Sequence, residues 1–286
     1  MLSSHLGDPR RHPLTTAQLR QLADRVGAAT PNGEDRDLEC SDLTILGYGP
    51  DMARRIISLL DDEPVLNHYL HRGMKLDCVP VTRVSPQYPL LLRKRLGLDA
   101  PGCLWAKGDL SLLEKPAVAL VGSRELFDKN REVAQEVGIQ AAKQGYVLIS
   151  GNARGADRTA QESCLAFGGQ IISIVADELW KHPLRENVLY LSEDGFDEAF
   201  SAQRALSRNR CIHALGIRTF VAQSSLRTGG TWDGTVKNLR FRWSQVHCFN
   251  DGSEAMELLS QMGANPVEIQ DLASFYDLPE DEISLF

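Results

Sequence analysis

Residues 117–124 read AVALVGSR, five apolar residues followed by Gly122, Ser123 and Arg124. A short apolar run that ends in glycine is typical of a strand buried in a parallel sheet. Ligands of such sheets bind where the strands end, so the Gly-Ser-Arg turn stands where a site is expected. This stretch therefore predicts both the fold class and the place of a candidate site.

The same pattern returns along the chain, with helical stretches between the repeats. Strands alternating with helices indicate parallel strands joined by crossover helices. We therefore predict an α/β fold, a Rossmann-like doubly wound and mostly parallel sheet. Further strands are expected at 146–149, 171–175, 218–222 and 245–249, and helices at 129–143 and 156–167.

Three parts are expected along the chain. Residues 1–80 predict a small helical domain of the helix-hairpin-helix or SAM-like type, with Thr16 capping the first helix. The turn at 46–50, Leu-Gly-Tyr-Gly-Pro, either presents backbone amides to a phosphate or only joins two packed helices. Residues 81–262 are expected to form the Rossmann-like domain, and the acid-rich residues 263–286 a tail.

Charge is distributed unevenly along this chain, whose formal net charge is −7. Between residues 201 and 243 basic residues exceed acidic ones by seven, whereas nine acids and no Lys or Arg follow residue 250. The arrangement favours local attraction of an anion, although a basic helix face exposed to solvent would give the same pattern.

Candidate ligand-binding residues follow three of the expected strands. Glycines let the backbone approach a ligand, arginines match the geometry of phosphate, and helix N-termini attract anions. The helix before residue 218 adds Arg-Asn-Arg at 208–210, either for phosphate oxygens or as an exposed face. The predicted nucleic-acid- or phosphate-binding residues are Gly122, Ser123, Arg124, Gly151, Asn152, Ala153, Arg154, Gly155, Asp157, Arg208, Arg210, Thr228, Gly229, Gly230 and Thr231.

In order and spacing, these motifs resemble the DprA/Smf family over roughly residues 85–250. The resemblance rests on Tyr88-Pro89, Leu104 to Leu110, Val118 to Arg124, Gly151 to Asp157 and Arg208 to Arg210. It implies a Rossmann-like domain that binds single-stranded DNA in a basic pocket lined by Arg124 and residues 151–157. It also implies a homodimer and, in naturally transforming bacteria, transfer of the DNA to the RecA recombinase.

The chain departs from that family at several places. Glu125-Leu126-Phe127-Asp128 replaces a small residue and Tyr-Gly, and Asn152 is unusual in its loop. Residues 228–234 replace a Ser-Gly-Ser loop and resemble the Gly-Gly-Thr loop of the cytokinin-activating phosphoribohydrolases. No winged helix is expected after residue 250. A role in a mobile element or in phage defence therefore stands beside DNA uptake and recombination.

Two alternatives to DNA binding use the same pocket, a nucleotide sensor and a nucleotide N-glycosidic hydrolase. Hydrolysis needs a carboxylate near the Gly-Gly-Thr loop, and without a glutamate between residues 231 and 253 only Asp233 could serve. We therefore predict no catalytic residue. For a DNA binder, Trp232 and Trp243 are candidates for stacking on bases, the other interpretation being core packing.

The composition narrows the class of protein. No apolar run approaches the roughly 20 residues of a membrane span, and the first 16 residues show no secretion signal. Six scattered cysteines without a Cys-x-x-Cys pair favour reduced thiols in a cytoplasm over a metal site. We predict a cytoplasmic protein that uses no metal and no cofactor.

Overall fold

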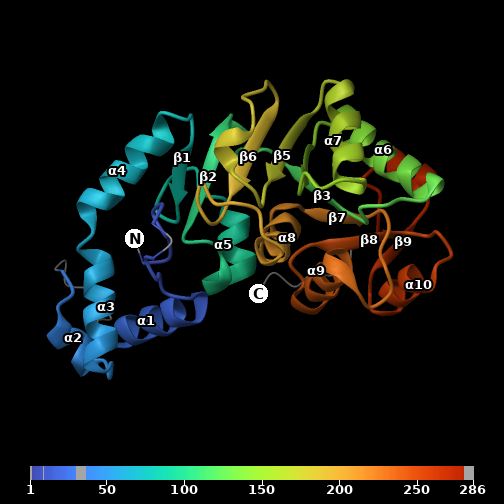
Figure 1. The fold of residues 1–286 in the computed structure, drawn as a ribbon. Helices are drawn as coiled ribbons and strands as arrows, with labels where there is room; N and C mark the ends of the chain where they lie inside the picture. The colour runs from blue at the N-terminus through green and yellow to red at the C-terminus, as the bar shows by residue number, and fades with distance from the viewer. Residues whose placement is uncertain (1, 9, 30–36, 280–286) are drawn as a thin grey trace. The chain divides into compact units, whose positions relative to one another are not determined.

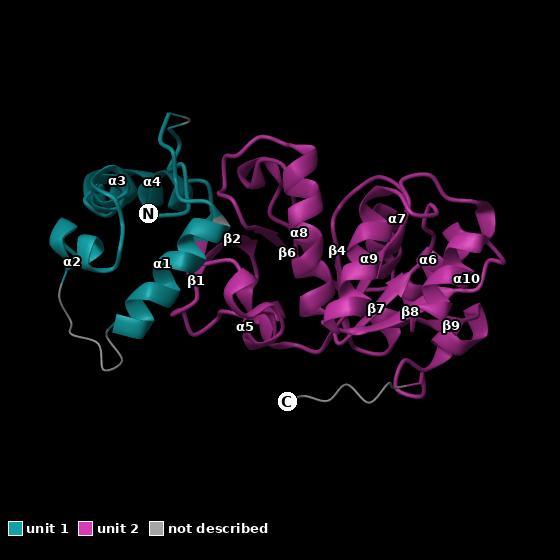
Figure 2. Cartoon of the chain, turned by 90° about the horizontal axis from the view of Figure 1, so that it is seen from below, with its two compact units in different colours: residues 1–79 teal, residues 80–286 magenta. Residues whose placement is uncertain are grey.

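The structure is a computed structural model that describes residues 2–8, 10–29 and 37–279. The chain forms two compact units, Met1–Val79 and Pro80–Phe286, shown in two colours in Figure 2. The division falls beside the boundary expected between residues 80 and 81. Each unit is described separately below.

Unit 1 is helical and has its own apolar core. Thr15, rather than Thr16, caps the first helix, because its hydroxyl accepts from the Gln18 amide (3.2 Å) while the Gln18 side chain accepts from the Thr15 amide (3.0 Å). Leu22, Leu43 and Ile56 are among the buried core residues. The helices are α1 (Thr16–Ala29), α2 (Cys40–Ile45), α3 (Pro50–Leu60) and α4 (Glu63–Met74).

The expected helical hairpin is formed by α2 and α3. Gly47 has φ +83°, which a side chain would disfavour, and Pro50 starts α3, where its missing N–H costs no helical hydrogen bond. Arg25 of α1 donates to the Leu46 carbonyl (2.9 Å) and lies over the Tyr48 ring. The turn is thus packed within unit 1, and its contact with a phosphate stays a prediction.

Unit 2 contains one sheet of nine strands in its described residues (Figure 1). The strand order is β1-β2-β6-β5-β4-β3-β7-β8-β9, and pairing from β6 through β9 is parallel, whereas β2 and β6 pair antiparallel. The strands are β1 (Val79–Thr82), β2 (Cys103–Gly108), β3 (Ala117–Val121), β4 (Val147–Ser150), β5 (Gln170–Ile174), β6 (Val188–Ser192), β7 (Arg218–Val221), β8 (Gln245–Phe249) and β9 (Asn265–Val267).

Helices cover both faces of this sheet, so the predicted doubly wound α/β fold is confirmed. Helices α6 and α7 pack against each other on one face, and α8 and α9 pack together on the other, where α5 also contacts α8 (Figure 1). The helices are α5 (Leu90–Leu96), α6 (Asp128–Lys143), α7 (Ala156–Ala166), α8 (Ala202–Leu215), α9 (Gly229–Phe241) and α10 (Glu254–Gln261), with 3-10 turns η1 (Gly97–Asp99), η2 (Leu110–Glu114), η3 (Leu179–Lys181) and η4 (Ile269–Ala273).

The strand order reverses direction next to β3. From β3 the chain passes to β4 on one side, whereas β7 lies on the other side and continues to β8. The loops that follow β3 and β7 consequently leave the sheet edge in opposite directions. A crevice is expected between such loops, and it is the usual ligand site of an open α/β sheet.

Residues 265–278 belong to unit 2 rather than to an acidic tail that begins at residue 263. Strand β9 pairs with β8, with Val267 opposite Phe249. Phe275 is fully buried, with its ring 4.7 Å from the Phe220 ring. The expectation failed because the acids of this segment alternate with apolar side chains that complete the core.

Candidate functional site

A large cavity lies at the reversal of strand order. Its volume is about 870 Å³, and its walls come from the loops after β3 and β7, from α8 and from the start of α9. A second cavity of about 350 Å³ adjoins it, since both are lined by Arg124, Arg154 and Arg208. Each is within the size range of ligand sites, and the predicted motifs therefore surround a real hollow.

The Gly-Ser-Arg turn after β3 forms one wall. A side chain on Gly122 would overlap the Ala156 methyl group, so glycine lets α7 pack against the turn. The Ser123 hydroxyl donates to the Gln223 carbonyl (3.3 Å) and so holds the wall in place. Arg124 is exposed in the cavity and forms no hydrogen bond or ion pair through its side chain with any residue that the structure describes.

Gln223, which the sequence did not single out, fixes the path of this turn. Its side-chain amide donates to the Glu125 carbonyl (3.1 Å), and its oxygen accepts from the Phe127 amide (3.0 Å). The residue follows β7, so one side chain ties the loop after β3 to the loop after β7. No motif marks it, and only the parallel pairing of these strands predicts such a contact.

The loop after β4 is organised by Asp157. Its carboxylate accepts from the backbone amides of Gly151 (3.1 Å) and Ala153 (3.2 Å), and thus closes the loop onto the start of α7. It does not hold Arg154, which pairs with Glu125 across the cavity edge (3.1 Å). Asn152, with φ +58°, and Gly155, with φ +86°, supply the left-handed backbone that the loop requires.

Arg208 is buried against this loop, with 6% of its surface exposed. Its guanidinium donates to the Ile174 carbonyl (2.7 Å) and occupies the space beside Gly151 that a larger residue would need. Burial lowers the pKa of Arg208 and raises the pKa of Asp157, and each charge opposes the shift of the other. The buried Nε of Arg208 has no hydrogen-bond partner in the described part of the chain.

The start of α9 forms a further wall of the cavity. Residues 228–231 line it, with Thr228 at the N-cap and no side chain capping the helix. Asn209 donates to the Gly230 carbonyl (3.2 Å) and orients this end of the helix. The first amides of a helix have no intrahelical acceptor and carry partial positive charge, so they favour an anion here.

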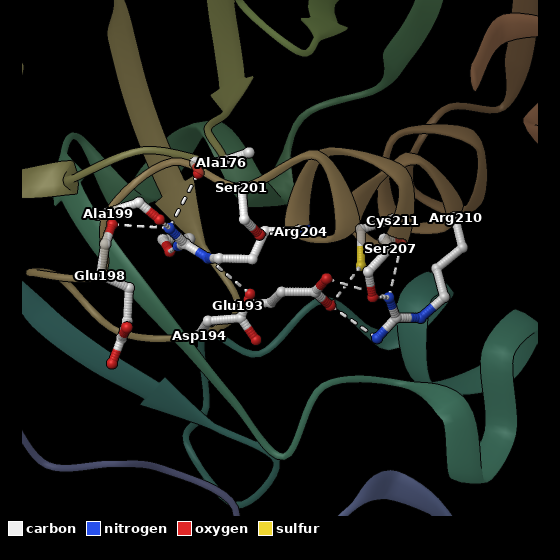
Figure 3. Close-up of polar contacts among 11 residues, drawn as sticks. Ala176, Glu193, Asp194, Glu198, Ala199, Ser201, Arg204, Ser207, Arg210 and Cys211 are labelled. Carbon is white, nitrogen blue, oxygen red and sulfur yellow. Dashed lines mark hydrogen bonds and ion pairs between the residues drawn. The ribbon is translucent and has the colours of Figure 1, made fainter. Parts of the chain in front are cut away.

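Arg210 lies outside these cavities, contrary to the prediction. Residues two apart on a helix point to different sides, and Arg210 pairs instead with the buried carboxylate of Glu193 (2.6 Å) (Figure 3). Its Nε also donates to the Asp99 carbonyl (3.2 Å). The next residue, Cys211, is fully buried, and burial together with Glu193 raises the pKa of its thiol, so it is not activated by Arg210.

Much of the basic segment 201–243 is likewise structural. Arg204 donates to Asp194 and to the carbonyls of Ala176, Glu198 and Ala199, as Figure 3 shows. Arg218 is buried against Gln245. Lys237 pairs with Asp233 (2.7 Å). Among the arginines of that segment, Arg208 lines the cavity.

Two exposed phenylalanines line the cavities, whereas the two candidate tryptophans take the other interpretation, core packing. Trp243 is only 8% exposed, and Trp232 packs against the core. Phe127 lines the large cavity and is 72% exposed, whereas Phe200 lines the second and is 58% exposed. Exposed aromatic rings beside arginines are a feature that sequence reasoning missed, because neither residue belongs to a motif.

The family described as DNA recombination-mediator protein A matches residues 80–276. The chain belongs to this family, DprA. Among curated relatives, DprA of Streptococcus pneumoniae is 33% identical over 141 residues, which cover 46% of this chain and 50% of the relative. DprA of Bacillus subtilis is 27% identical over 177 residues, 58% of this chain and 57% of the relative. The chain thus spans about half the length of these relatives in the alignments.

Solved DprA structures share the fold. The structure of DprA from S. pneumoniae matches with a TM-score of 0.69 at 24% identity and covers 91% of this chain and 97% of that one. DprA from Helicobacter pylori, described for its single-stranded DNA binding mode, matches with a TM-score of 0.57 at 22% identity over 68% of this chain and 94% of that one. The relatives are named DNA processing proteins.

The described residues contain no group of three side chains placed to hold a metal ion. In the same residues, no helix has the length and apolar character that crossing a membrane requires. The groups that the site offers to a ligand are arginines, backbone amides and aromatic rings.

Proposed function

We propose that this DprA-family protein binds single-stranded DNA in the cavity between the loops after β3 and β7. The observation that carries the proposal is one hollow lined by exposed Arg124, by Arg208 and by the N-terminus of α9, which no side chain caps. An exposed guanidinium and the free amides of a helix N-terminus are two kinds of phosphate-binding group.

The exposed rings of Phe127 and Phe200 favour a nucleic acid with unpaired bases over a bare anion. Base stacking on aromatic side chains is sequence-tolerant and requires that the base faces be free, as they are in a single strand. The single-stranded DNA binding mode described for the H. pylori relative supports the same ligand. A cytoplasmic location, a role in DNA uptake, recombination or defence, a homodimer and delivery of DNA to a RecA-type recombinase belong to this proposal.

Arg124→Ala is expected to weaken single-stranded DNA binding at least tenfold, because the charged hydrogen bonds of an exposed arginine to phosphate are lost. Fluorescence anisotropy of a labelled oligonucleotide measures this across a salt series. For wild type, the logarithm of the affinity should fall by about 0.7 per contacted phosphate for each decade of salt. The variant should have a smaller slope.

Arg93→Ala is the matched control for this experiment. Arg93 is an exposed arginine of α5 that lines none of the cavities described here, and its removal should leave the affinity unchanged. Wild type that fails to bind DNA at low salt, or a control as weak as Arg124→Ala, would contradict the proposal.

Phe127→Ala with Phe200→Ala is expected to reduce the affinity for single-stranded DNA by about 1–3 kcal/mol per lost stacked base, with the salt slope unchanged. Both rings are largely exposed, so the melting temperature should not move. The control is Phe167→Ala, an exposed ring at the end of α7 that lines neither cavity. A reduced salt slope in the double variant would argue against stacking.

A nucleotide hydrolase is not supported by the position of Asp233. This residue pairs with exposed Lys237 and does not line the cavities of the described residues. Asp157 does line the large cavity, but its carboxylate already accepts hydrogen bonds from two backbone amides. A competition experiment distinguishes a nucleotide sensor from a DNA binder. If the protein is a sensor, mononucleotides should displace the labelled oligonucleotide at equal concentration.

A further inference from the structure

A third hollow opens beside the large cavity, over the first turns of α6 and α7. Its volume is about 380 Å³, and its lining includes four arginines and two glutamates, an excess of two positive charges. The lining charges are Arg124, Arg131, Arg154, Arg158, Glu125 and Glu162. We refer to this hollow as the arginine groove.

The arginine groove is continuous with the proposed DNA site. Arg124, Glu125 and Arg154 line both hollows. The ion pair between Arg154 and Glu125 lies at their common edge, and its two side chains are 72% and 88% exposed. Because an exposed pair of this kind contributes only about 0–1 kcal/mol, a ligand with negative charge can open it at small cost.

Two of the arginines occupy positions that their own helices disfavour. Arg131 lies in the first turn of α6 and Arg158 in the first turn of α7, where the helix dipole is positive and repels a cation. Neither side chain makes an ion pair within the described part of the chain, and both are exposed. Folding therefore gains little from these charges, whereas an anion in the groove would be attracted by both arginines and by both helix ends.

We propose that the arginine groove binds the sugar–phosphate backbone of nucleotides that flank those held in the large cavity. The inference rests on the proposed DNA binding and extends it by a second stretch of backbone contacts. Phosphate is the part recognised, since the groove offers charge and no lining aromatic ring. A longer strand should consequently bind more tightly than one that fills the large cavity alone.

The test compares a short oligonucleotide of about 4 nucleotides with one of about 16, the range of site sizes for single-stranded DNA domains. Arg131→Ala/Arg158→Ala is expected to weaken binding of the long strand about tenfold and of the short strand less than twofold. With two phosphates lost, the salt slope for the long strand should fall by about 1.4. The double variant should melt as wild type does.

The control is Arg93→Ala/Lys94→Ala, which removes two exposed charges from α5, outside the groove. It should bind both lengths as wild type does. Equal loss on short and long strands, or unchanged binding of the long strand by the groove variant, overturns the groove while DNA binding stands. Wild type that binds neither length overturns the proposed function and the groove with it.

Discussion

Arg208→Ala is expected to lower the free energy of unfolding by about 3–5 kcal/mol, the cost of leaving a buried charge without a compensating one. The variant loses the hydrogen bond to the Ile174 carbonyl and leaves Asp157 buried without the cation that faces it. It also leaves space beside Gly151, which the guanidinium fills. Urea denaturation of wild type and variant measures the difference.

The deficit of this variant should grow as the pH rises. Burial already raises the folded-state pKa of Asp157 above 3.8, and without Arg208 it is raised further. An acid with a raised pKa holds its proton longer in the folded state, so above the unfolded pKa stability falls with increasing pH. The loss at neutral pH should therefore exceed the loss near pH 4.

The double variant Arg208→Ala/Asp157→Asn tests whether the loss of stability comes from the buried charge of Asp157. Asparagine keeps an oxygen that can accept from the amides of Gly151 or Ala153 and has no charge to bury. The double variant should be more stable than Arg208→Ala and should lack its pH dependence. If the double variant is less stable than Arg208→Ala at neutral pH, the Arg208 and Asp157 side chains contribute to the free energy of unfolding through packing alone.

Gly155→Ala is expected to reduce DNA binding more than tenfold and to cost about 2–4 kcal/mol of stability, the sum of an unfavourable backbone conformation and a steric overlap. Gly155 has φ +86°, and an added Cβ would overlap the backbone of Ser123 and Arg124. The obstructing atoms are backbone atoms, so the whole turn after β3 must move. Anisotropy and denaturation together measure both effects.

Gly145→Ala separates the two causes. Gly145 has φ +76°, but nothing lies within 4 Å of an added Cβ. Gly145→Ala should therefore lower the free energy of unfolding only by the cost of the unfavourable backbone conformation, about 1 kcal/mol. Its affinity for DNA should match wild type. Equal behaviour of the two variants would mean that the contact between the loops after β3 and β4 does not matter for binding.

The sequence predicts the centre of this fold well because β3, β4, β7 and β8 are buried along their whole length, and β3 and β4 read as nearly continuous apolar runs. It also predicts the position of the cavity, since the ends of parallel strands share one edge. Strands β2 and β6 are harder to find. They pair antiparallel with each other at the side of the sheet, and charged residues border β6 closely.

The sequence does not predict the role of a site residue where that role depends on contacts with residues distant in the sequence. Arg208 and Arg210 look equivalent in a tripeptide, yet one faces Asp157 and the other Glu193. For Trp243 the sequence left base stacking and core packing open, and its burial in the core agrees with packing. Gln223 is an ordinary polar residue until the neighbouring loop is placed beside it.

The two hydrogen bonds of the Gln223 side chain reach main-chain atoms of Glu125 and Phe127, not their side chains. Substitutions at Glu125 and Phe127 are therefore expected to leave the course of the backbone unchanged. Gln223 thus holds the backbone of this turn whichever side chains the turn carries. The side chains that this turn presents to the cavity, the ring of Phe127 and the carboxylate of Glu125, can therefore change while the backbone of the cavity wall stays in place.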